Sequence, residues 1–347
     1  MKIALITYHY STNHGAIMQT YALCKFLIDK GYDMEIIDIR QDENWEVPIH
    51  IKVAKYLIQK RRINNFIKEN YPTLTHRYAS IDELRKDPPK ADCFLVGSDQ
   101  TWNPLISKEN FLAYFLDFGD NKKRISYASS FGLKEWPQEY SNYIPNVMKC
   151  LERFSSISVR EHEGASLCSK TFGIDPVVVL DPTFLNDSYQ NLVGKIKNRN
   201  EIVCYKLNKT PDFFHNVQEL SKVFNLPLLL LNNNYPIKGF KYCFNTSTQQ
   251  WLRRIAGAKF VFTDSFHGIA FSILFRKQFA ATLNHNGRDS RLISLMSMAG
   301  LSDRLFDSTE DLVKNIGRLE QIDYDKVFEK LKPEIENSRI YLLKALQ

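Results

Sequence analysis

The chain has 347 residues, enough for two domains of ordinary size, and 44% of them are hydrophobic, which excludes an intrinsically disordered protein. The formal charge of +7 favours anionic ligands or an anionic surface, but no basic motif with interleaved aromatics accompanies it, so we expect no nucleic-acid partner. No apolar stretch approaches the roughly 20 residues that cross a bilayer, and the first residues reach a polar turn too soon for a secretory signal. We therefore expect a cytoplasmic protein.

A strand, a helix and a second strand are predicted at the start of the chain, in residues 2–7, 17–30 and 34–39. Such a βαβ unit closes onto a parallel sheet. Further strands, each followed by a polar or glycine-containing turn, are predicted at residues 93–96, 124–128, 157–159 and 177–180.

The alternation of strands and helices restarts after residue 190. The predicted strands are residues 202–207, 228–231, 259–263 and 279–283, and the predicted helices are residues 213–224, 248–256 and 269–275. We expect an α/β protein with two Rossmann-like domains, residues 1–190 and 191–323, and a ligand cleft between them. Residues 324–347 form a last predicted helix that could cross back onto the first domain.

The six cysteines have neither a C-x-x-C pair nor a companion histidine at metal spacing. Most stand in apolar surroundings, which favours buried free thiols over a zinc site, and we expect no metal.

Two turns in the first domain carry candidate binding residues. In "YHYSTNHGAIMQTYAL", Gly15 allows a ligand close to the backbone at a helix N-terminus, and Asn13, His14 and Gln19 are candidate polar contacts. The alternative is that Asn13 and Gly15 only shape the turn. The G-x-G-x-x-G fingerprint of redox dinucleotide sites is absent.

The second turn, "VGSDQTWNP", follows the predicted strand 93–96. Ser98 and Asp99 would open into the cleft, where Asp99 could act as a general acid or base, or else merely cap the turn. Trp102 is either a platform for a sugar ring or a core residue.

A third turn, "VFTDSFHGIAFSILF", places His267 between a predicted strand and a predicted helix, with Asp264 and Ser265 suited to capping. Ligands of α/β sheets bind at such turns, and a helix N-terminus attracts anions. A histidine there suits proton transfer or contact with phosphate, whereas the alternative is a satisfied core histidine.

These blocks, together with "RISYASSFG", "SVREHEGASL" and "VVLDPTFL", resemble in their order the polysaccharide pyruvyl transferase family. The resemblance covers nearly the whole chain and implies a GT-B-like fold. It also implies transfer of the enolpyruvyl unit of phosphoenolpyruvate to a sugar as a cyclic ketal, during assembly of a surface, capsular or exopolysaccharide. Phosphoenolpyruvate is then a co-substrate, and no other cofactor is expected.

The resemblance assigns binding of phosphoenolpyruvate to His267 and Arg160, and His267 as the catalytic acid is our hypothesis. Asp99 and the turn from Asn13 to Gln19 would face the acceptor. Several members of the family have an arginine two residues before the histidine, where this chain has Ser265. Serine can still bind an oxyanion but brings no charge. We favour Arg291 as the replacement cation, and the other candidates are Arg124, Lys206 and Arg288.

The acceptor is a sugar on a lipid or a nucleotide carrier, and neither its identity nor the oligomeric state follows from the sequence. A basic amphipathic helix around residues 49–72 could rest on the anionic inner face of a membrane, or it could simply be solvated. Its basic residues are Lys52, Lys55, Lys60, Arg61, Arg62 and Lys68. Two other functions remain open: a GT-B glycosyltransferase that uses a nucleotide-sugar, and a catalytically silent member of the family.

Overall fold

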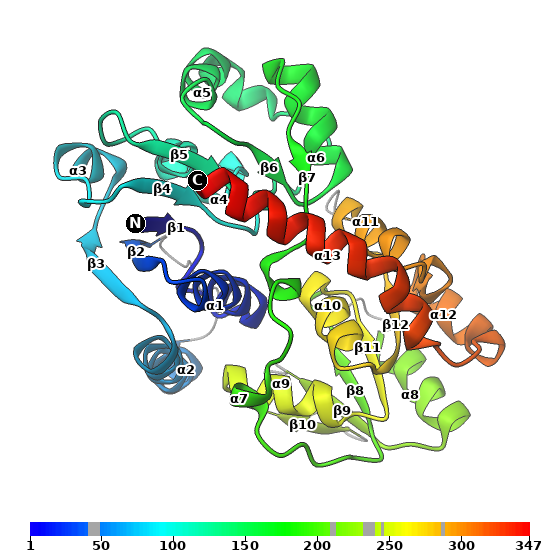
Figure 1. Cartoon of the computed structure of the whole chain (residues 1–347). Coiled ribbons are helices and arrows are strands. Elements are labelled where there is room, and N and C mark those ends of the chain that lie inside the picture. Colours follow the sequence, from blue (N-terminus) through cyan, green and yellow to red (C-terminus); the bar gives the residue numbers. More distant parts are fainter. Residues whose placement is uncertain (41–48, 209–212, 232–239, 244–245, 286–288) are drawn as a thin grey trace. The chain divides into compact units, whose positions relative to one another are not determined.

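The computed structural model describes residues 1–40, 49–208, 213–231, 240–243, 246–285 and 289–347 (Figure 1). Contacts divide the chain into two compact units. Unit 1 comprises Met1–Val47, Asn64–Asn186 and Pro333–Gln347, and unit 2 comprises Pro48–Ile63 and Asp187–Lys332. Each unit is built on its own parallel sheet.

The sheet of unit 1 has the strand order β3-β2-β1-β4-β5, with all strands parallel. Its strands are β1 (Lys2–Ile6), β2 (Asp33–Ile39), β3 (Thr73–Tyr78), β4 (Cys93–Val96) and β5 (Lys123–Ser126). A further parallel pair is formed by β6 (Ser158–Val159) and β7 (Val177–Val178). The helices are α1 (His14–Asp29), α3 (Ile81–Lys86), α4 (Pro104–Ser107), α5 (Ile144–Leu151) and α6 (His162–Leu167).

The sheet of unit 2 has the strand order β10-β9-β8-β11-β12-β13, again with all strands parallel. Its strands are β8 (Ile202–Tyr205), β9 (Leu228–Leu231), β10 (Lys241–Cys243), β11 (Phe260–Thr263), β12 (Gln278–Thr282) and β13 (Leu305–Phe306). The helices are α7 (Gln190–Val193), α8 (Phe213–Phe224), α9 (Thr248–Gly257), α10 (Phe266–Leu274), α11 (Ser290–Met298) and α12 (Thr309–Asn315).

Both sheets therefore have the Rossmann strand order, in which the chain reverses direction across the sheet between the first and fourth strands. These switch points lie between β1 and β4 in unit 1, and between β8 and β11 in unit 2. All four strands are buried, except that Lys2 is partly exposed at the start of β1. The predicted α/β class with two Rossmann-like halves is confirmed.

Two helices have residues in both units. Helix α2 is Ile49–Asn70, and α13 is Tyr324–Leu346. From Pro333 onward, α13 belongs to unit 1, where Leu342, Ala345 and Leu346 join a core cluster with Ile3. The Leu180 amide also donates to Ser338 Oγ at 2.9 Å, which ties this part of α13 to the chain after β7.

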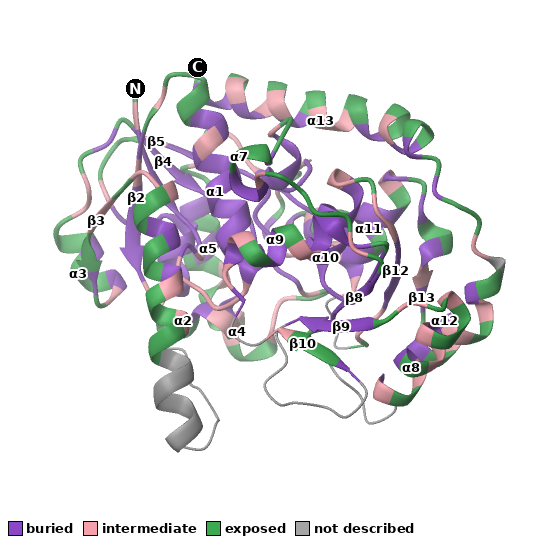
Figure 2. Ribbon diagram, turned by 90° about the horizontal axis from the view of Figure 1, so that it is seen from below, coloured by how far each residue is buried: buried purple, intermediate pink, exposed green. Residues whose placement is uncertain are grey.

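Figure 2 shows α10 buried over most of its length, and eight of its nine residues, Phe266–Ile273, are buried. A helix that is apolar on all sides belongs in a core rather than on a surface, which agrees with the apolar run predicted after His267. Five of the six cysteines are likewise buried, and all six are free thiols, as expected.

Three strands were not predicted: β3, β10 and β13. β3 and β10 are outer strands with mostly exposed or half-exposed residues, so neither has the apolar run that identified the central strands. β13 has only two residues.

Candidate functional site

In unit 1, the turn after β1 is held to the turn after β4 by hydrogen bonds. Thr7 Oγ1 donates to the Ser98 carbonyl at 3.0 Å, and the fully buried Gln19 donates through Nε2 to Thr7 Oγ1 at 2.9 Å. Asn13 is the N-cap of α1, where its Oδ1 accepts from the Gly15 amide at 2.9 Å. These contacts support the structural alternative for Asn13 and Gly15, and their contact with an acceptor stays a prediction.

Arg160, directly after β6, lies among three carboxylates. Its guanidinium is 2.8 Å from Asp181 Oδ2, 3.5 Å from Asp99 Oδ1 and 3.9 Å from Glu161 Oε2, and its side chain is 1% exposed. Ser98 Oγ donates to the same Asp181 oxygen at 3.0 Å. Burial by itself would lower the pKa of Arg160, but the charges of Asp181, Asp99 and Glu161 raise it. The cluster brings together three predicted site residues, Ser98, Asp99 and Arg160.

Asp99 stands at the carboxyl end of β4 with a left-handed backbone, at a φ of 72°. Its Oδ1 accepts from the amide of Gln100 at 3.0 Å, and the residue is 8% exposed. Non-glycine residues with positive φ are uncommon and gather at functional sites. The strained turn therefore supports the prediction of a functional carboxylate, although the hydrogen bond to Gln100 is also that of a turn cap.

Trp102 is a core residue, so the sugar-platform alternative is wrong. Its side chain is fully buried, its ring stacks on Phe115 with centroids 5.3 Å apart, and its Nε1 donates to the Tyr114 carbonyl at 2.9 Å. No face of the indole is left for a sugar.

A second charged cluster, at the carboxyl ends of β1 and β2, was not predicted from the sequence. His9 Nε2 lies 3.1 Å from Asp38 Oδ1, and Arg40 donates to both Asp38 oxygens at 2.6 Å. Burial would raise the pKa of Asp38, but the hydrogen bonds from His9 and Arg40 bring it down to about 2. The only sequence signal was an acidic and a basic residue two positions apart in "IDIR", which also suits an exposed strand end.

In unit 2, Lys206 and Asp264 meet at the switch point, one after β8 and the other after β11. Lys206 Nζ lies 3.4 Å from Asp264 Oδ2 and donates to Thr282 Oγ1 at 2.8 Å. Asp264 also accepts from the Leu207 and Asn208 amides at 2.7 and 2.9 Å. Burial lowers the pKa of Lys206, and the charge of Asp264 opposes that shift. The cluster provides a buried cation at a strand edge.

His267 is the second residue of α10 and is 4% exposed. Ser265 is the N-cap of that helix, since its Oγ accepts from the Gly268 amide at 3.4 Å, which confirms the predicted cap. A helix N-terminus carries partial positive charge, so the turn places an imidazole and a hydroxyl where an anion is favoured.

The glycine after His267 is required by a close approach. A Cβ added to Gly268 would lie 2.2 Å from Thr263 Oγ1, which itself donates to the Tyr205 carbonyl at 2.7 Å and accepts from the Ser265 amide at 3.1 Å. Thr263 thus fixes the turn between β11 and α10, and only glycine leaves room for it.

The candidate replacement cations have different surroundings. Arg291 is the second residue of α11, at a helix N-terminus as predicted, and it is partly buried. Arg124 in unit 1 is committed to backbone carbonyls, including those of Phe118 and Gly119 at 2.9 and 2.7 Å. Arg288 lies outside the described residues. Lys206 is therefore the candidate that shares a cluster with the turn before His267.

No described helix is long and apolar enough to cross a membrane. On α2, Leu57 and Ile58 are 57% and 44% exposed, and Lys60 and Arg61 beside them are also exposed. The side chains of Lys52 and Lys55 lie outside the described ones. Within the described chain, no group of three or more histidine, cysteine or acidic side chains is placed to hold a metal ion.

Comparison with solved structures gives the class of protein. A Methanocaldococcus jannaschii UDP-GlcNAc 2-epimerase, solved with UDP-GlcNAc and UDP, matches with a TM-score of 0.55 at 12% identity, over 93% of this chain and 94% of that one. A Thermobaculum terrenum O-GlcNAc transferase mutant matches with a TM-score of 0.53 at 9% identity, over 100% of this chain and 66% of that one. A spinosyn rhamnosyltransferase matches at 0.51 and 8% identity, over 99% of both chains. The fold is thus the GT-B fold of two Rossmann-like domains.

The family follows from the sequence comparison. The model of the polysaccharide pyruvyl transferase family matches residues 13–286, and the chain belongs to this family. The predicted resemblance is confirmed, and the protein is a transferase of polysaccharide modification. No curated protein matches it in sequence.

Proposed function

We propose that this protein transfers the enolpyruvyl unit of phosphoenolpyruvate to a sugar of a surface or capsular polysaccharide precursor, forming a cyclic ketal and releasing phosphate. The observation that carries the proposal is the position of His267 in the first turn of α10, directly after the turn in which Asp264 pairs with Lys206 from the end of β8. A proton donor, a buried cation and a helix N-terminus are the groups that an enol phosphate requires.

The cluster around Arg160 in unit 1 and the cluster of Lys206 and Asp264 in unit 2 differ in charge, and this difference suggests which substrate each one binds. In unit 1, three carboxylates surround Arg160, which disfavours a trianionic donor but suits a neutral sugar whose hydroxyl must lose a proton. In unit 2, Lys206 balances Asp264 and His267 adds a titratable group. Phosphoenolpyruvate is accordingly assigned to unit 2, and the acceptor to unit 1 with Asp99 as the base.

The reaction begins when His267 gives a proton to the methylene carbon of phosphoenolpyruvate, which leaves an oxocarbenium-like centre at the adjacent carbon. One sugar hydroxyl attacks that carbon while Asp99 removes its proton. The second hydroxyl attacks the same carbon as the bond to phosphate breaks, and its proton leaves with the phosphate. Two carbon–oxygen bonds form, one breaks, and no redox step occurs.

The remaining predicted residues have supporting roles in this proposal. Ser265 Oγ and the first amides of α10 contact the phosphate, and Lys206 or Arg291 supplies the charge that arginine brings in several relatives. The predicted contact of Arg160 with phosphoenolpyruvate has less geometric support than a positioning role, because Arg160 already holds Asp99 and Asp181. Ser98 and Gln19 position the turns that face the acceptor.

A thermal-shift experiment tests the donor. Phosphoenolpyruvate at about 100 times its Kd should add about 2.7 kcal/mol to the native state, which moves the midpoint by several degrees. His267→Ala should abolish this shift, whereas His215→Ala, an exposed histidine on α8, should keep it. Stabilisation by a UDP-hexose alone would favour the glycosyltransferase alternative, and no response to either ligand would favour a silent member of the family.

A lipid-linked acceptor would place α2 at an anionic membrane, and we include that contact in the proposal. The exposed Leu57 and Ile58 beside Lys60 and Arg61 support it. Co-sedimentation with anionic vesicles should fall when the exposed Lys60 and Arg61 are replaced by glutamate, and unchanged sedimentation would contradict the membrane contact.

A further inference from the structure

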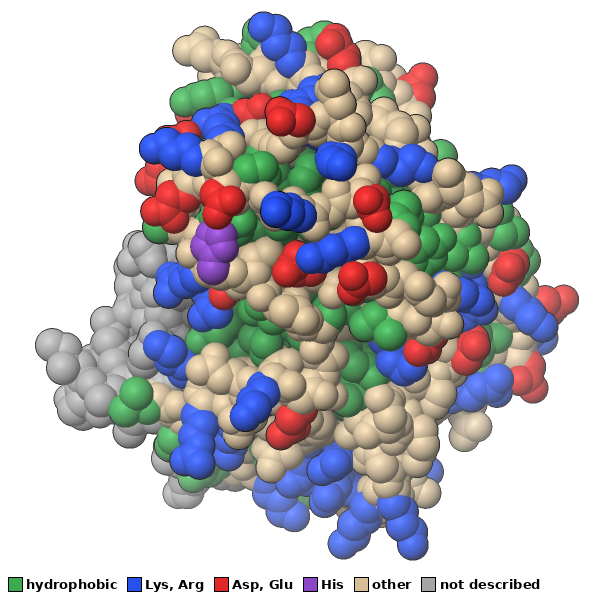
Figure 3. Space-filling view, turned by 60° about the vertical axis from the view of Figure 1, so that its left-hand side comes forward, with side chains coloured by type: hydrophobic (Ala, Val, Ile, Leu, Met, Phe, Trp, Pro, Cys, Tyr) green, Lys and Arg blue, Asp and Glu red, His purple; other side chains and the backbone are tan. Residues whose placement is uncertain are grey.

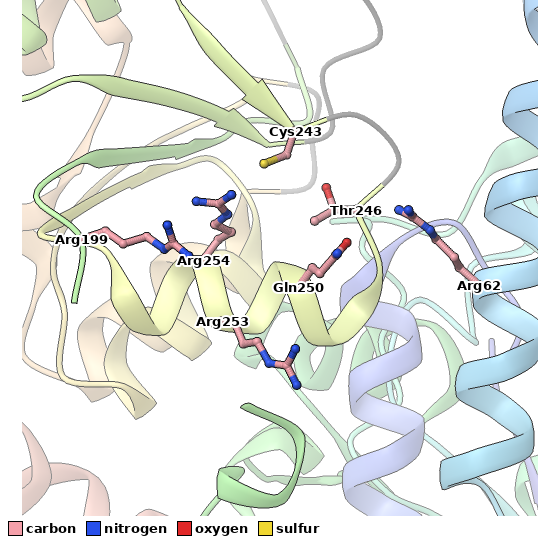
Figure 4. Close-up of a pocket in the computed structure, with 7 residues that line it drawn as sticks. All are labelled: Arg62, Arg199, Cys243, Thr246, Gln250, Arg253 and Arg254. Atoms are coloured by element: carbon pink, nitrogen blue, oxygen red, sulfur yellow. The ribbon is translucent and has the colours of Figure 1, made fainter. Parts of the chain in front are cut away.

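A cavity in unit 2 is lined mainly by arginines and takes no part in the proposed chemistry. It has a volume of about 410 Å³ and is lined by Arg62, Arg199, Cys243, Thr246, Gln250, Arg253 and Arg254 (Figure 4). Helix α9 provides the last three of these residues, and Cys243 ends β10. All seven belong to unit 2.

The cavity is distinct from the cluster around His267. Arg199 and Glu201 precede β8, whereas Lys206 follows it. A strand of four residues spans about 13 Å, so the end of the cavity at Arg199 and Arg254 lies at the opposite edge of the sheet from Lys206. A ligand bound there would not occupy the donor site.

Positive charge in the cavity exceeds negative charge. Arg199 Nε and Arg254 Nη1 share one carboxylate oxygen, Glu201 Oε1, at 4.0 and 3.3 Å. Arg253 Nε donates to a neutral acceptor, the Val193 carbonyl, at 2.9 Å. Among the described residues, four guanidinium groups thus line a cavity beside a single paired carboxylate. Figure 3 shows lysine and arginine side chains also gathered at the lower edge of one face.

Arg62 provides a donor on another side of the cavity. Its Nη1 is buried, and within the described part of the chain it makes no hydrogen bond. Figure 4 shows the guanidinium directed toward Thr246, which precedes α9. Buried polar groups are normally hydrogen-bonded, so a buried guanidinium nitrogen of this kind indicates an acceptor brought by a ligand.

The residues fit a multiply charged phosphate group better than a single carboxylate. One guanidinium group can donate to two oxygens of a phosphate at once. Several guanidinium groups around one cavity can therefore balance the several negative charges of a diphosphate. The N-terminus of α9, a helix of ten residues, adds its partial positive charge. A volume of about 410 Å³ is within the range of small-molecule sites.

We propose that this cavity binds the diphosphate group through which the acceptor sugar is joined to its carrier. That the diphosphate belongs to the acceptor rests on the proposed function. That the cavity binds a diphosphate at all rests on the arginines alone. A nucleoside diphosphate and a polyprenyl diphosphate share this group, and the experiment separates them.

Cys243 is a built-in reporter of occupancy. It lines the cavity and is the one partly exposed thiol of the six, all of which are described. Burial raises the pKa of the other five, to about 12 for Cys93, Cys150 and Cys168 and further for Cys24 and Cys204. Iodoacetamide, which is uncharged and does not compete for the arginines, should therefore alkylate Cys243 first, as mass spectrometry of the native protein would show.

Pyrophosphate is the first probe. At ten times its Kd it should slow alkylation of Cys243 about tenfold, because only the unoccupied fraction reacts. Arg62→Gln and Arg199→Gln should each raise that Kd about tenfold or more, as expected for loss of a charge-assisted hydrogen bond. Arg254 still pairs with Glu201 in Arg199→Gln, so this variant should fold, which the unliganded melting midpoint checks.

Arg61→Gln is the matched control, since Arg61 is the neighbouring arginine on α2, is exposed and does not line the cavity. It should keep the protection. Stronger protection by UDP than by pyrophosphate would assign a nucleotide carrier, and protection by a polyprenyl diphosphate in micelles, but not by empty micelles, would assign a lipid carrier.

The inference would be overturned if pyrophosphate left the alkylation rate unchanged, if the two pocket variants were protected like the wild type, or if sulfate at equal ionic strength protected as well. These outcomes are independent of the donor. If pyrophosphate does not protect Cys243 of the wild type but phosphoenolpyruvate still stabilises the protein, only the diphosphate site is contradicted. If pyrophosphate protects Cys243 but phosphoenolpyruvate does not stabilise the protein, only the proposed donor is contradicted.

Discussion

At the switch point of unit 1, one guanidinium lies among Asp99, Glu161 and Asp181, whereas at that of unit 2 Lys206 is paired with Asp264 and His267 begins a helix. The first five strands have the same order in both sheets, and unit 2 adds a sixth strand at the edge. The shared order brings turns to equivalent positions, while the residues in those turns decide the charge. This difference in charge supports the proposal that Lys206 of unit 2 contacts the donor, whereas Arg160 of unit 1 holds the carboxylates around it.

The largest expected effect comes from removing the unit 1 cation. Arg160→Met should lower the free energy of unfolding by about 3–5 kcal/mol, because it leaves buried carboxylates without their partner. Urea denaturation measures the loss. Arg153→Met, whose side chain is 41% exposed and 3.9 Å from Asp117, is the control and should cost less than about 1 kcal/mol.

The proposed difference between the two clusters would be contradicted if Arg160→Met retained wild-type stability but was no longer stabilised by phosphoenolpyruvate. Arg160 would then be a ligand-binding residue, as the family resemblance implies, and both clusters would serve the donor.

A smaller effect is expected at the unit 2 turn. Gly268→Ala should destabilise the protein by about 1–3 kcal/mol, because the new Cβ would overlap Thr263 Oγ1. Alanine is otherwise the better helix former, so a loss of stability would identify the overlap with Thr263 as the cause. Gly317→Ala, where a Cβ meets nothing within 4 Å, should change stability by less than about 0.5 kcal/mol in the same denaturation experiment.

A Gly268→Ala variant as stable as the wild type would show that the turn before α10 can shift to accommodate the added Cβ at little energetic cost. The position of His267 would then depend less on Thr263 than the contact suggests.

The local pattern of apolar residues predicted the central strands well, because these strands are buried on both faces. β4 and β9 were predicted to the residue, because strands covered on both faces are continuous apolar runs bounded by polar turns. α8 was likewise predicted to the residue, and the predicted last helix, residues 324–347, extends one residue beyond α13. Edge strands such as β3 and β10 lack this signal, since one side of each faces solvent.

The candidate site was only partly predictable. Ser265 and His267 follow a strand and begin a helix, which the sequence indicates directly. The enclosure of Arg160 and the contact of His9 with Asp38 could not be predicted, since a side chain's partners from other strands have no local signal.

The sequence by itself determined the alternation of strands and helices, the two Rossmann-like halves and, through its ordered motifs, the family. Only the tertiary structure decided which charges meet. Parallel strands bring turns from distant parts of the chain to one edge, so Asp99, Arg160 and Asp181 become one cluster, and Arg199 and Arg254 come to share Glu201. Periodicity records which face of an element is buried, but the partner across that face is fixed by the packing of the whole unit.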